Sequence, residues 1–152
     1  MPTKDRFCVV ELRTLNWPSA LHIASKRFRL FVAGDVTHVP TETISAFAGG
    51  ALKRGMVYLC AWGPDCERFH DIVDEVIVED ELGERLFVGT RMGDTVMTTW
   101  HEDEDLEESL DFFINLAHPT EGFHSDSDSW VIVCLDNPDW AKVIRDRLEQ
   151  QT

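Results

Sequence analysis

The stretch MVYLCAWGPDCERFHDIV, residues 56–73, joins a continuous apolar run to a helix-like pattern through a Gly-Pro turn. Residues 56–62 are apolar throughout, as in a strand that is covered on both of its faces. A helix is expected to begin near Asp65 and to reach Val73 or beyond. A strand of this kind followed directly by a helix is typical of α/β proteins, so this stretch indicates the fold class.

The same alternation of strand and helix continues on both sides of this stretch. We expect further strands at residues 7–12, 28–34, 95–101 and 129–136. We expect further helices at 18–26, 41–55, 104–117 and from Asn137 onward, an antiparallel hairpin of 76–80 and 85–89 joined by 81–84, and a turn at 89–94.

These elements predict a three-layer α/β sandwich with a mostly parallel sheet, helices on both faces and an added antiparallel hairpin. The 152 residues suit a single domain, and residues 1–25 are expected to pack on it as an N-terminal extension. Thr41 and Asn137 are expected to cap the helices that follow them, and Gly55 to end the first of these. The Gly49-Gly50 pair weakens that helix, and close packing against the sheet would be a reason to keep it.

The net charge of −14 is divided unevenly along the chain. Residues 1–60 hold eight Lys/Arg against four Asp/Glu, whereas residues 61–152 hold six against twenty-four. Such an acidic surface disfavours nucleic acid, because phosphates would be repelled. It permits a basic protein partner or a cationic small molecule, and it is equally compatible with a plain solvated surface.

Nothing in the sequence indicates a membrane segment or a secretion signal. No apolar run approaches the ~20 residues that span a bilayer, and the N-terminus MPTKDRF lacks the apolar core of a signal peptide. We therefore expect a cytoplasmic protein whose four cysteines are reduced.

Four strand ends are expected to meet at one edge of the sheet, where open α/β sheets bind their ligands. They are Gly34-Asp35, Trp62-Gly63, Trp100-His101 and Asp136-Asn137. The candidate ligand-binding residues are Asp35, Asp136, Trp62 and Trp100. The two tryptophans occupy equivalent places on two strands, so they could together line a pocket for a flat or cationic group, or they could simply cover the core.

Cys66 is the candidate catalytic nucleophile, because a helix N-terminus lowers the pKa of a thiol. The acidic neighbours of Cys66 have the opposite effect. His70 lies four residues further along the same helical face, and His101 at a neighbouring strand end is the better candidate base. Asp71 adjoins His70, but adjacent helical residues point apart, so we do not expect it to orient the imidazole.

The other three cysteines, Cys8, Cys60 and Cys134, lie in apolar runs and are expected in the core. A zinc site built from Cys60, Cys66, His70 and His101 is a further alternative, but its ligand spacing differs from that of ordinary zinc sites. The sequence also lacks the glycine-rich motifs that bind phosphates. We therefore expect no metal and no cofactor.

The densest charge run is HEDEDLEESLD, residues 101–111, where seven of eleven residues are acidic. It fits an amphipathic helix with an acidic outer side, and that side is a potential docking face for a basic partner.

Taken together, CAWGPDCERFHD (60–71), VMTTWHEDEDLEESLDFF (96–113) and SWVIVCLDNPDWA (129–141) resemble a family of small bacterial proteins with a domain of unknown function. The resemblance implies a bacterial, cytosolic origin, and it carries no activity, cofactor or catalytic residue. From the residues themselves we expect a non-catalytic binding, adaptor or immunity-type protein. The alternative is a thiol-dependent acyl or glycosyl transferase or hydrolase that uses Cys66 with His101 or His70.

Overall fold

The described residues form a sheet of five strands, all parallel, in the order β1-β5-β2-β3-β4. The computed structural model describes residues 2–87 and 95–151, with the backbone alone for 83–87. The strands are β1 (Phe7–Leu12), β2 (Phe28–Ala33), β3 (Met56–Trp62), β4 (Met97–Trp100) and β5 (Trp130–Leu135). The helices are η1 (Lys4–Arg6), α1 (Thr41–Arg54), α2 (Cys66–Phe87), α3 (Leu106–Asn115), η2 (Glu121–Asp126) and α4 (Pro138–Glu149).

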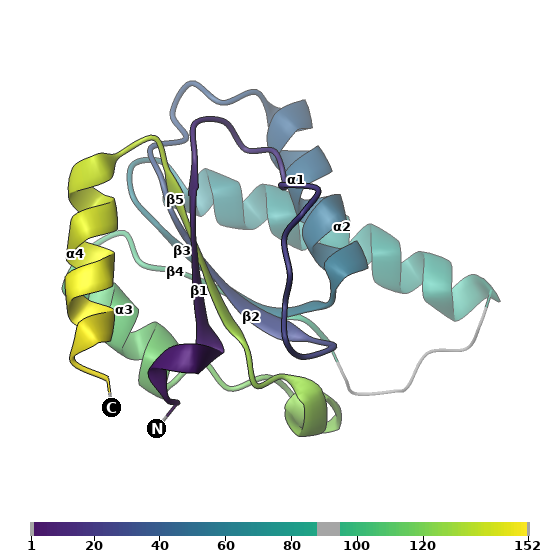
Figure 1. Cartoon of the computed structure of the whole chain (residues 1–152). Helices are drawn as coiled ribbons and strands as arrows, with labels where there is room; N and C mark the ends of the chain where they lie inside the picture. Colours follow the sequence, from purple (N-terminus) through teal and green to yellow (C-terminus); the bar gives the residue numbers. More distant parts are fainter. Residues whose placement is uncertain (1, 88–94, 152) are drawn as a thin grey trace.

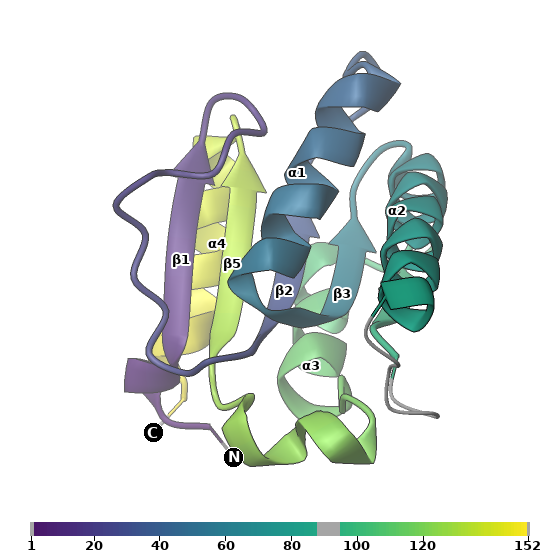
Figure 2. The ribbon, with the colours of Figure 1, turned by 90° about the vertical axis from the view of Figure 1, so that its right-hand side faces the viewer.

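Two helices cover each face of the sheet, so the predicted three-layer α/β sandwich is confirmed. In Figure 2, α1 lies in front of the strands and α4 lies behind them. Along each strand, successive side chains point to opposite faces. Leu59 and Ala61 therefore join the core under α1 and α2, whereas Tyr58 and Cys60 join the core under α3 and α4.

The predicted antiparallel hairpin is wrong over the described residues. Residues 76–87 continue α2 instead, and residues 88–94, which include the predicted turn, lie outside the described part of the chain. The β-branched residues had suggested strands. In α2, however, Phe69, Val73 and Ile77 recur every four residues and are buried on one face against the sheet.

Residues 2–27 contribute one strand to the sheet itself. As predicted, residues 7–12 form a strand, β1, but this strand is an integral edge that pairs with β5. The predicted helix at 18–26 is wrong. Side chains 21–26 alternate between half-buried and exposed, which is the pattern of an extended segment.

Trp17, which precedes this segment, explains why one of the two glycines in α1 has no side chain. Trp17 stacks on Phe47 of α1 at 4.6 Å between ring centroids, and a Cβ at Gly50 would approach the Trp17 ring to 2.8 Å. Gly50 therefore makes room for this tryptophan and not for the sheet. A Cβ at Gly49 would meet nothing within 4 Å.

Helix ends largely follow the expected chemistry. Asn137 caps α4 by accepting a hydrogen bond from the Trp140 amide, and Gly55 ends α1 in the left-handed conformation at φ 103°. Thr41 does not cap α1, because Pro40 occupies the N-cap position, and the Thr41 hydroxyl accepts a hydrogen bond from Arg68 instead.

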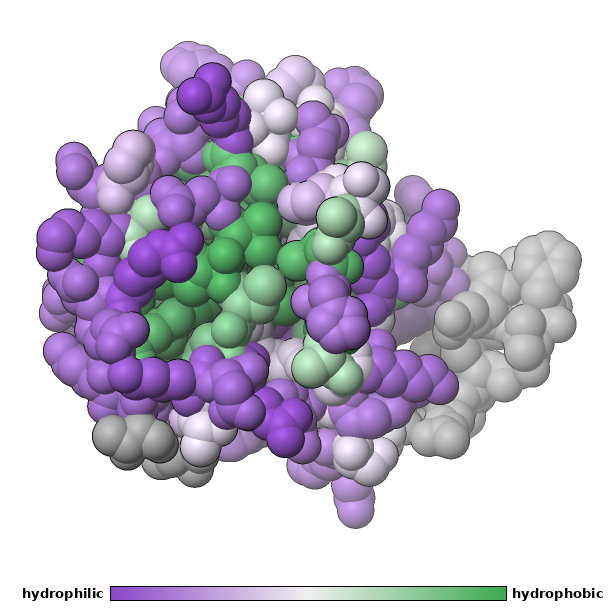
Figure 3. Space-filling model, in the orientation of Figure 1, coloured by the Kyte–Doolittle hydropathy of each residue, from purple (hydrophilic) through white to green (hydrophobic). Residues whose placement is uncertain are grey.

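An apolar strip of surface follows the free edge of the sheet at β1. Figure 3 shows it as a green area, framed by hydrophilic residues, in the region where Figure 1 labels β1. Its strand residues Cys8, Val10 and Leu12 are half-buried against the core.

Among the described helices, none is long and apolar enough to span a bilayer.

Candidate functional site

The loops after β1, β2 and β5 surround a cavity at the carboxyl edge of the sheet (top of Figure 1). The cavity has a volume of about 810 Å³. We call it the carboxyl-edge cavity; its polar side chains are Arg13, Thr14, Asn16, Asp35, His38, Thr43, Asp136 and Asn137. Because β2 leads to a helix on one face and β5 to a helix on the other, the cavity occupies the switch point at which open α/β sheets bind ligands.

Asp35 follows β2 after Gly34 and is held by a local turn. Its Oδ1 accepts hydrogen bonds from the amide of Thr37 at 3.1 Å and from its hydroxyl. These bonds lower the pKa of Asp35, because they stabilise the charged carboxylate. Asp35 is therefore ionised at neutral pH and has its second oxygen available for a ligand.

Asp136 follows β5 and is positioned by an unusual backbone conformation. Its φ is 44°, in the left-handed region that aspartate tolerates better than most residues. Its amide donates to the carbonyl of Leu12 at 2.7 Å, which fixes the end of β5 beside the end of β1. Within the described residues, neither Asp35 nor Asp136 has an ion-pair partner within 4 Å.

Trp140 of α4 gives the cavity an aromatic wall. Trp62 packs edge-on against it, with 4.9 Å between the ring centroids, and donates its indole N–H to the carbonyl of Glu104. Trp62 therefore does not line the cavity but supports the tryptophan that does. The predicted ligand residues Asp35 and Asp136 both line the cavity, and Trp62 packs against Trp140 outside the lining.

Trp100 lies elsewhere. The register pairs Trp100 with Ala61 and not with Trp62, so the two tryptophans point to opposite faces of the sheet. Trp100 is 43% exposed and packs on His70 of α2, with 4.5 Å between the rings. The shared aromatic pocket of Trp62 and Trp100 is therefore not formed.

Cys66 begins α2 as predicted, but its thiol is enclosed. It is 2% exposed, and the space between it and Val32, Val36 and Phe69 is too small for a water molecule. Burial raises the pKa of this thiol, and hydrogen bonding by the backbone of His101 offsets the rise only in part. These conditions disfavour the thiolate that a nucleophile needs.

Neither candidate base reaches the sulfur of Cys66. The ring of His101 points to the α3 face, where Nε2 contacts the hydroxyl of Thr99 at 2.9 Å and Nδ1 lies 3.2 Å from Glu104. The ring of His70 contacts Thr98 through Nε2 at 2.9 Å. In the described structure, the geometry therefore gives no support to a catalytic pair of Cys66 with either histidine.

Asp71 does contact His70, contrary to our expectation for adjacent helical residues. Its Oδ1 lies 2.9 Å from Nδ1 of the imidazole. With Thr98 on the other ring nitrogen, both nitrogens of His70 are occupied. The histidine therefore joins α2 to β4 at the edge of the sheet.

The four residues of the alternative zinc site are also divided between the two faces. Cys60 points under α3 with its sulfur 3.5 Å from the Thr99 hydroxyl, whereas Cys66 and His70 belong to α2. No group of three or more His, Cys, Asp or Glu in the described residues is arranged to hold a metal ion.

Residues 7–151 match the model of a protein family described as "Domain of unknown function (DUF7684)". This chain belongs to that family. The match extends from β1 to α4, and it confirms the expected membership of a family of unknown function. No curated protein and no solved structure matches the chain.

The cavity lining includes Arg13 and Trp140, which were not among the sequence-based candidates. Arg13 follows β1, a strand whose carboxyl end was not included in the expected edge. Trp140 is half-buried and packs partly against the core. Its position three residues after the Asn137 cap was the available signal, because it places the ring in the first turn of a helix that begins at this edge.

Proposed function

We propose that this protein is a non-catalytic, cytosolic binding protein whose carboxyl-edge cavity receives the cationic group of a small ligand. The observation that carries the proposal is the pair of carboxylates, Asp35 and Asp136, which line the cavity without an ion-pair partner within 4 Å among the described residues. A bound ammonium or guanidinium group would supply the missing partner.

The other walls of the cavity support the same class of ligand. The Trp140 ring offers an aromatic face to the cavity. Among aromatic side chains, tryptophan binds cations best. The net charge of −18 on residues 61–152 would attract a cation from solution and increase its association rate. Arg13 and His38 could accept an anionic group on the same ligand.

Titration with agmatine, a small molecule with a guanidinium and an ammonium group, tests this proposal by calorimetry. We expect saturable binding that Asp35→Asn and Asp136→Asn each weaken about tenfold or more, as the loss of a charged hydrogen bond would do. Glu75→Gln is the matched control, because it removes an exposed carboxylate of α2 far from the cavity lining. Absence of saturable binding, or equal losses in all three variants, would refute the proposal.

A basic protein partner, as for an adaptor or immunity-type protein, is the second candidate. The first turn of α3 favours it, because the charge of Asp105 raises the pKa of neighbouring Glu108 and shows how densely negative charge is placed there. Poly-L-lysine is a suitable probe, with binding expected to weaken on Glu107→Gln but not on Asp35→Asn. Binding that persists unchanged in high salt would contradict this second candidate.

A further inference from the structure

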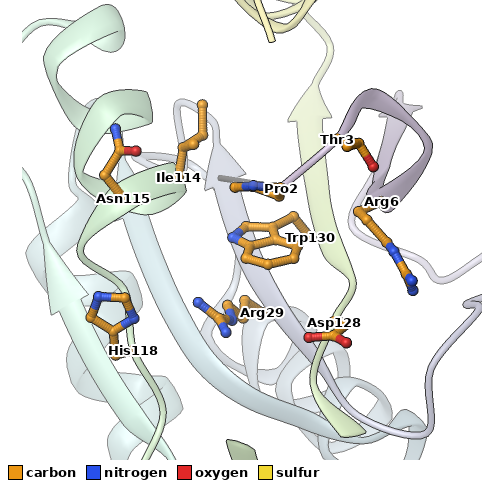
Figure 4. Close-up of a pocket in the computed structure, with 9 residues that line it drawn as sticks. All are labelled: Pro2, Thr3, Arg6, Arg29, Ile114, Asn115, His118, Asp128 and Trp130. Carbon is orange, nitrogen blue, oxygen red and sulfur yellow. The ribbon is translucent and has the colours of Figure 1, made fainter. Parts of the chain in front are cut away.

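A second cavity, of about 430 Å³, opens at the opposite, amino edge of the sheet. We call it the amino-edge cavity; Arg29 of β2, Trp130 of β5, the end of α3 and the residues around η1 form its walls. Figure 4 shows Trp130 next to Arg29, with Ile114, Asn115 and His118 on one side and Asp128 on the other. This site is separate from the carboxyl-edge cavity, and its chemistry is different.

Arg29 presents a guanidinium that is only partly satisfied by the protein. It is paired with Trp130 in the sheet register, and its Cζ lies 4.3 Å from the centroid of the indole ring. Nη1 donates to the carbonyl of Ala117 at 2.9 Å. Nε is buried without a hydrogen-bond partner, and no carboxylate of the described residues lies within 4 Å as an ion pair.

Trp130 has the second unsatisfied donor in the same cavity. The residue is 7% exposed, and its Nε1 is buried without a partner. By contrast, the indoles of Trp17 and Trp62 both donate to backbone carbonyls at 2.9 Å. In Figure 4 the Trp130 nitrogen is on the side of the ring that faces Ile114 and Asn115, two residues of the cavity wall.

Arg6 and Arg29 bring positive charge to the cavity lining, and Asp128 brings negative charge. Burial lowers the pKa of Arg29, and the charge of Asp128 opposes this shift. A guanidinium nevertheless keeps its charge in proteins at neutral pH. Its planar fork of N–H groups matches the geometry of carboxylate and phosphate oxygens.

We propose that the amino-edge cavity binds a small molecule through an oxyanion group, either a phosphate or a carboxylate, with Arg29 Nε and Trp130 Nε1 as the donors. Both donors are N–H groups, so the complementary ligand atom is an acceptor, and the adjacent positive charge favours an anionic one. The cavity is far larger than the ~30 Å³ of a water molecule, so an organic body can accompany the anion. The apolar walls of Pro2 and Ile114 suit such a body.

Two-dimensional ¹H–¹⁵N spectroscopy of the indole N–H groups tests this proposal in the whole chain. Inorganic phosphate and acetate are titrated separately at constant ionic strength, with chloride as the reference anion. We expect a saturable shift of the Trp130 signal and constant signals for Trp17 and Trp62. Saturation by phosphate alone or by acetate alone assigns the anionic group.

Two variants with opposite expected effects on the affinity for the anion test the proposal further. Arg29→Gln should weaken binding about tenfold or more, whereas Asp128→Asn should strengthen it, because it removes the negative charge near the guanidinium. If Arg29→Gln does not fold, Trp130→Phe replaces it, because this change keeps an aromatic ring and removes the donor. We then expect weaker binding, which is measured from the backbone amide signals because the Trp130 indole signal is lost. No saturable shift with either anion, as when ordered water satisfies both donors, would overturn the proposal, and so would unchanged affinity in these variants.

Discussion

Gly63 sets how closely the ends of β2 and β3 approach each other at the carboxyl edge. Its φ is 116°, and an added Cβ would lie 2.2 Å from the carbonyl oxygen of Gly34. We predict that Gly63→Ala lowers the free energy of unfolding by roughly 2 kcal/mol or more, because strain in the left-handed region adds to a backbone clash. Urea denaturation measures this loss.

Gly49 is the matched control for the same change. It lies within α1, and a Cβ there would meet nothing within 4 Å. Gly49→Ala should therefore raise the free energy of unfolding by about 0.5–1 kcal/mol, since alanine loses less backbone entropy in a helix. Losses of similar size in both variants would contradict the assigned role of Gly63.

The buried thiols predict a loss of stability at alkaline pH. Burial raises the pKa of Cys60 to about 12 from its usual 9.0. Below pH 9 the thiol is protonated in the folded and unfolded chains, so its contribution is fully present. Above pH 9 the unfolded chain releases the proton first, and stability falls as the pH rises toward the folded pKa.

Cys60→Ala isolates this effect from the other groups that titrate in the same range. Unfolding free energies measured by urea at several pH values above 9 should decline less steeply in the variant than in the original chain. If the free energy of unfolding declines with pH equally steeply in both proteins, the Cys60 thiol is not shielded from solvent as its buried position indicates.

At the level of single residues, the sequence predicted part of the carboxyl-edge cavity and not all of it. Asp35 and Asp136 were predicted because each lies at the carboxyl end of an apolar strand-like run. The separation of Trp62 from Trp100 depends on the pairing of Trp100 with Ala61. Local residue patterns contain no information on that register, which is set by how whole strands align.

At the level of elements, α2 shows how packing overrides local preference. The β-branched residues after Asp74 favour a strand locally, but the helix that starts at Cys66 continues through them and buries Ile77. The four-residue spacing of Phe69, Val73 and Ile77 was present in the sequence and was the stronger signal. A helical periodicity extended across the predicted boundary would have identified the helix.

The N-terminus of α3 gives a prediction that separates capping from charge. The side chain of Asp105 accepts a hydrogen bond from the Glu108 amide at 2.8 Å. Asp105→Ala should cost about 1 kcal/mol of stability, because it leaves this helix donor without its partner. Chemical denaturation monitored by circular dichroism measures the change.

Asp103→Ala provides the control, because it removes the same charge from an exposed residue without a capping contact. This variant should be neutral or slightly stabilising, since it relieves repulsion in the acidic segment. Equal destabilisation by both changes would refute the capping role of Asp105.

At the level of the whole molecule, the class of fold could be predicted but the order of the strands could not. Continuous apolar runs alternating with amphipathic helices indicated a parallel, covered sheet. The position of β5 between β1 and β2 joins segments more than a hundred residues apart. No local sequence pattern indicates that these three strands are neighbours. The carboxyl-edge cavity depends on this strand order, because it is formed by the ends of all three strands.

The net charge of −14 predicts that salt stabilises the folded chain. Like charges repel more strongly in the compact state, and salt shortens their range from ~30 Å at 0.01 M to ~8 Å at 0.15 M. We expect the melting temperature to rise over this range of sodium chloride concentration. The rise should be roughly 2–4 °C for each kcal/mol gained in the free energy of unfolding. A melting temperature that falls with added salt would indicate that attractive ion pairs dominate.

The placement of β5 also bears on how this chain folds during its synthesis. The ribosome delivers β2, β3 and β4 early, and these neighbours can pair as they emerge. β1 emerges before all of them, yet among the described strands its only sheet partner is β5. Among the described strands, β1 can therefore pair only after residues 130–135 leave the exit tunnel, and until then the nascent chain carries this apolar segment without its sheet partner.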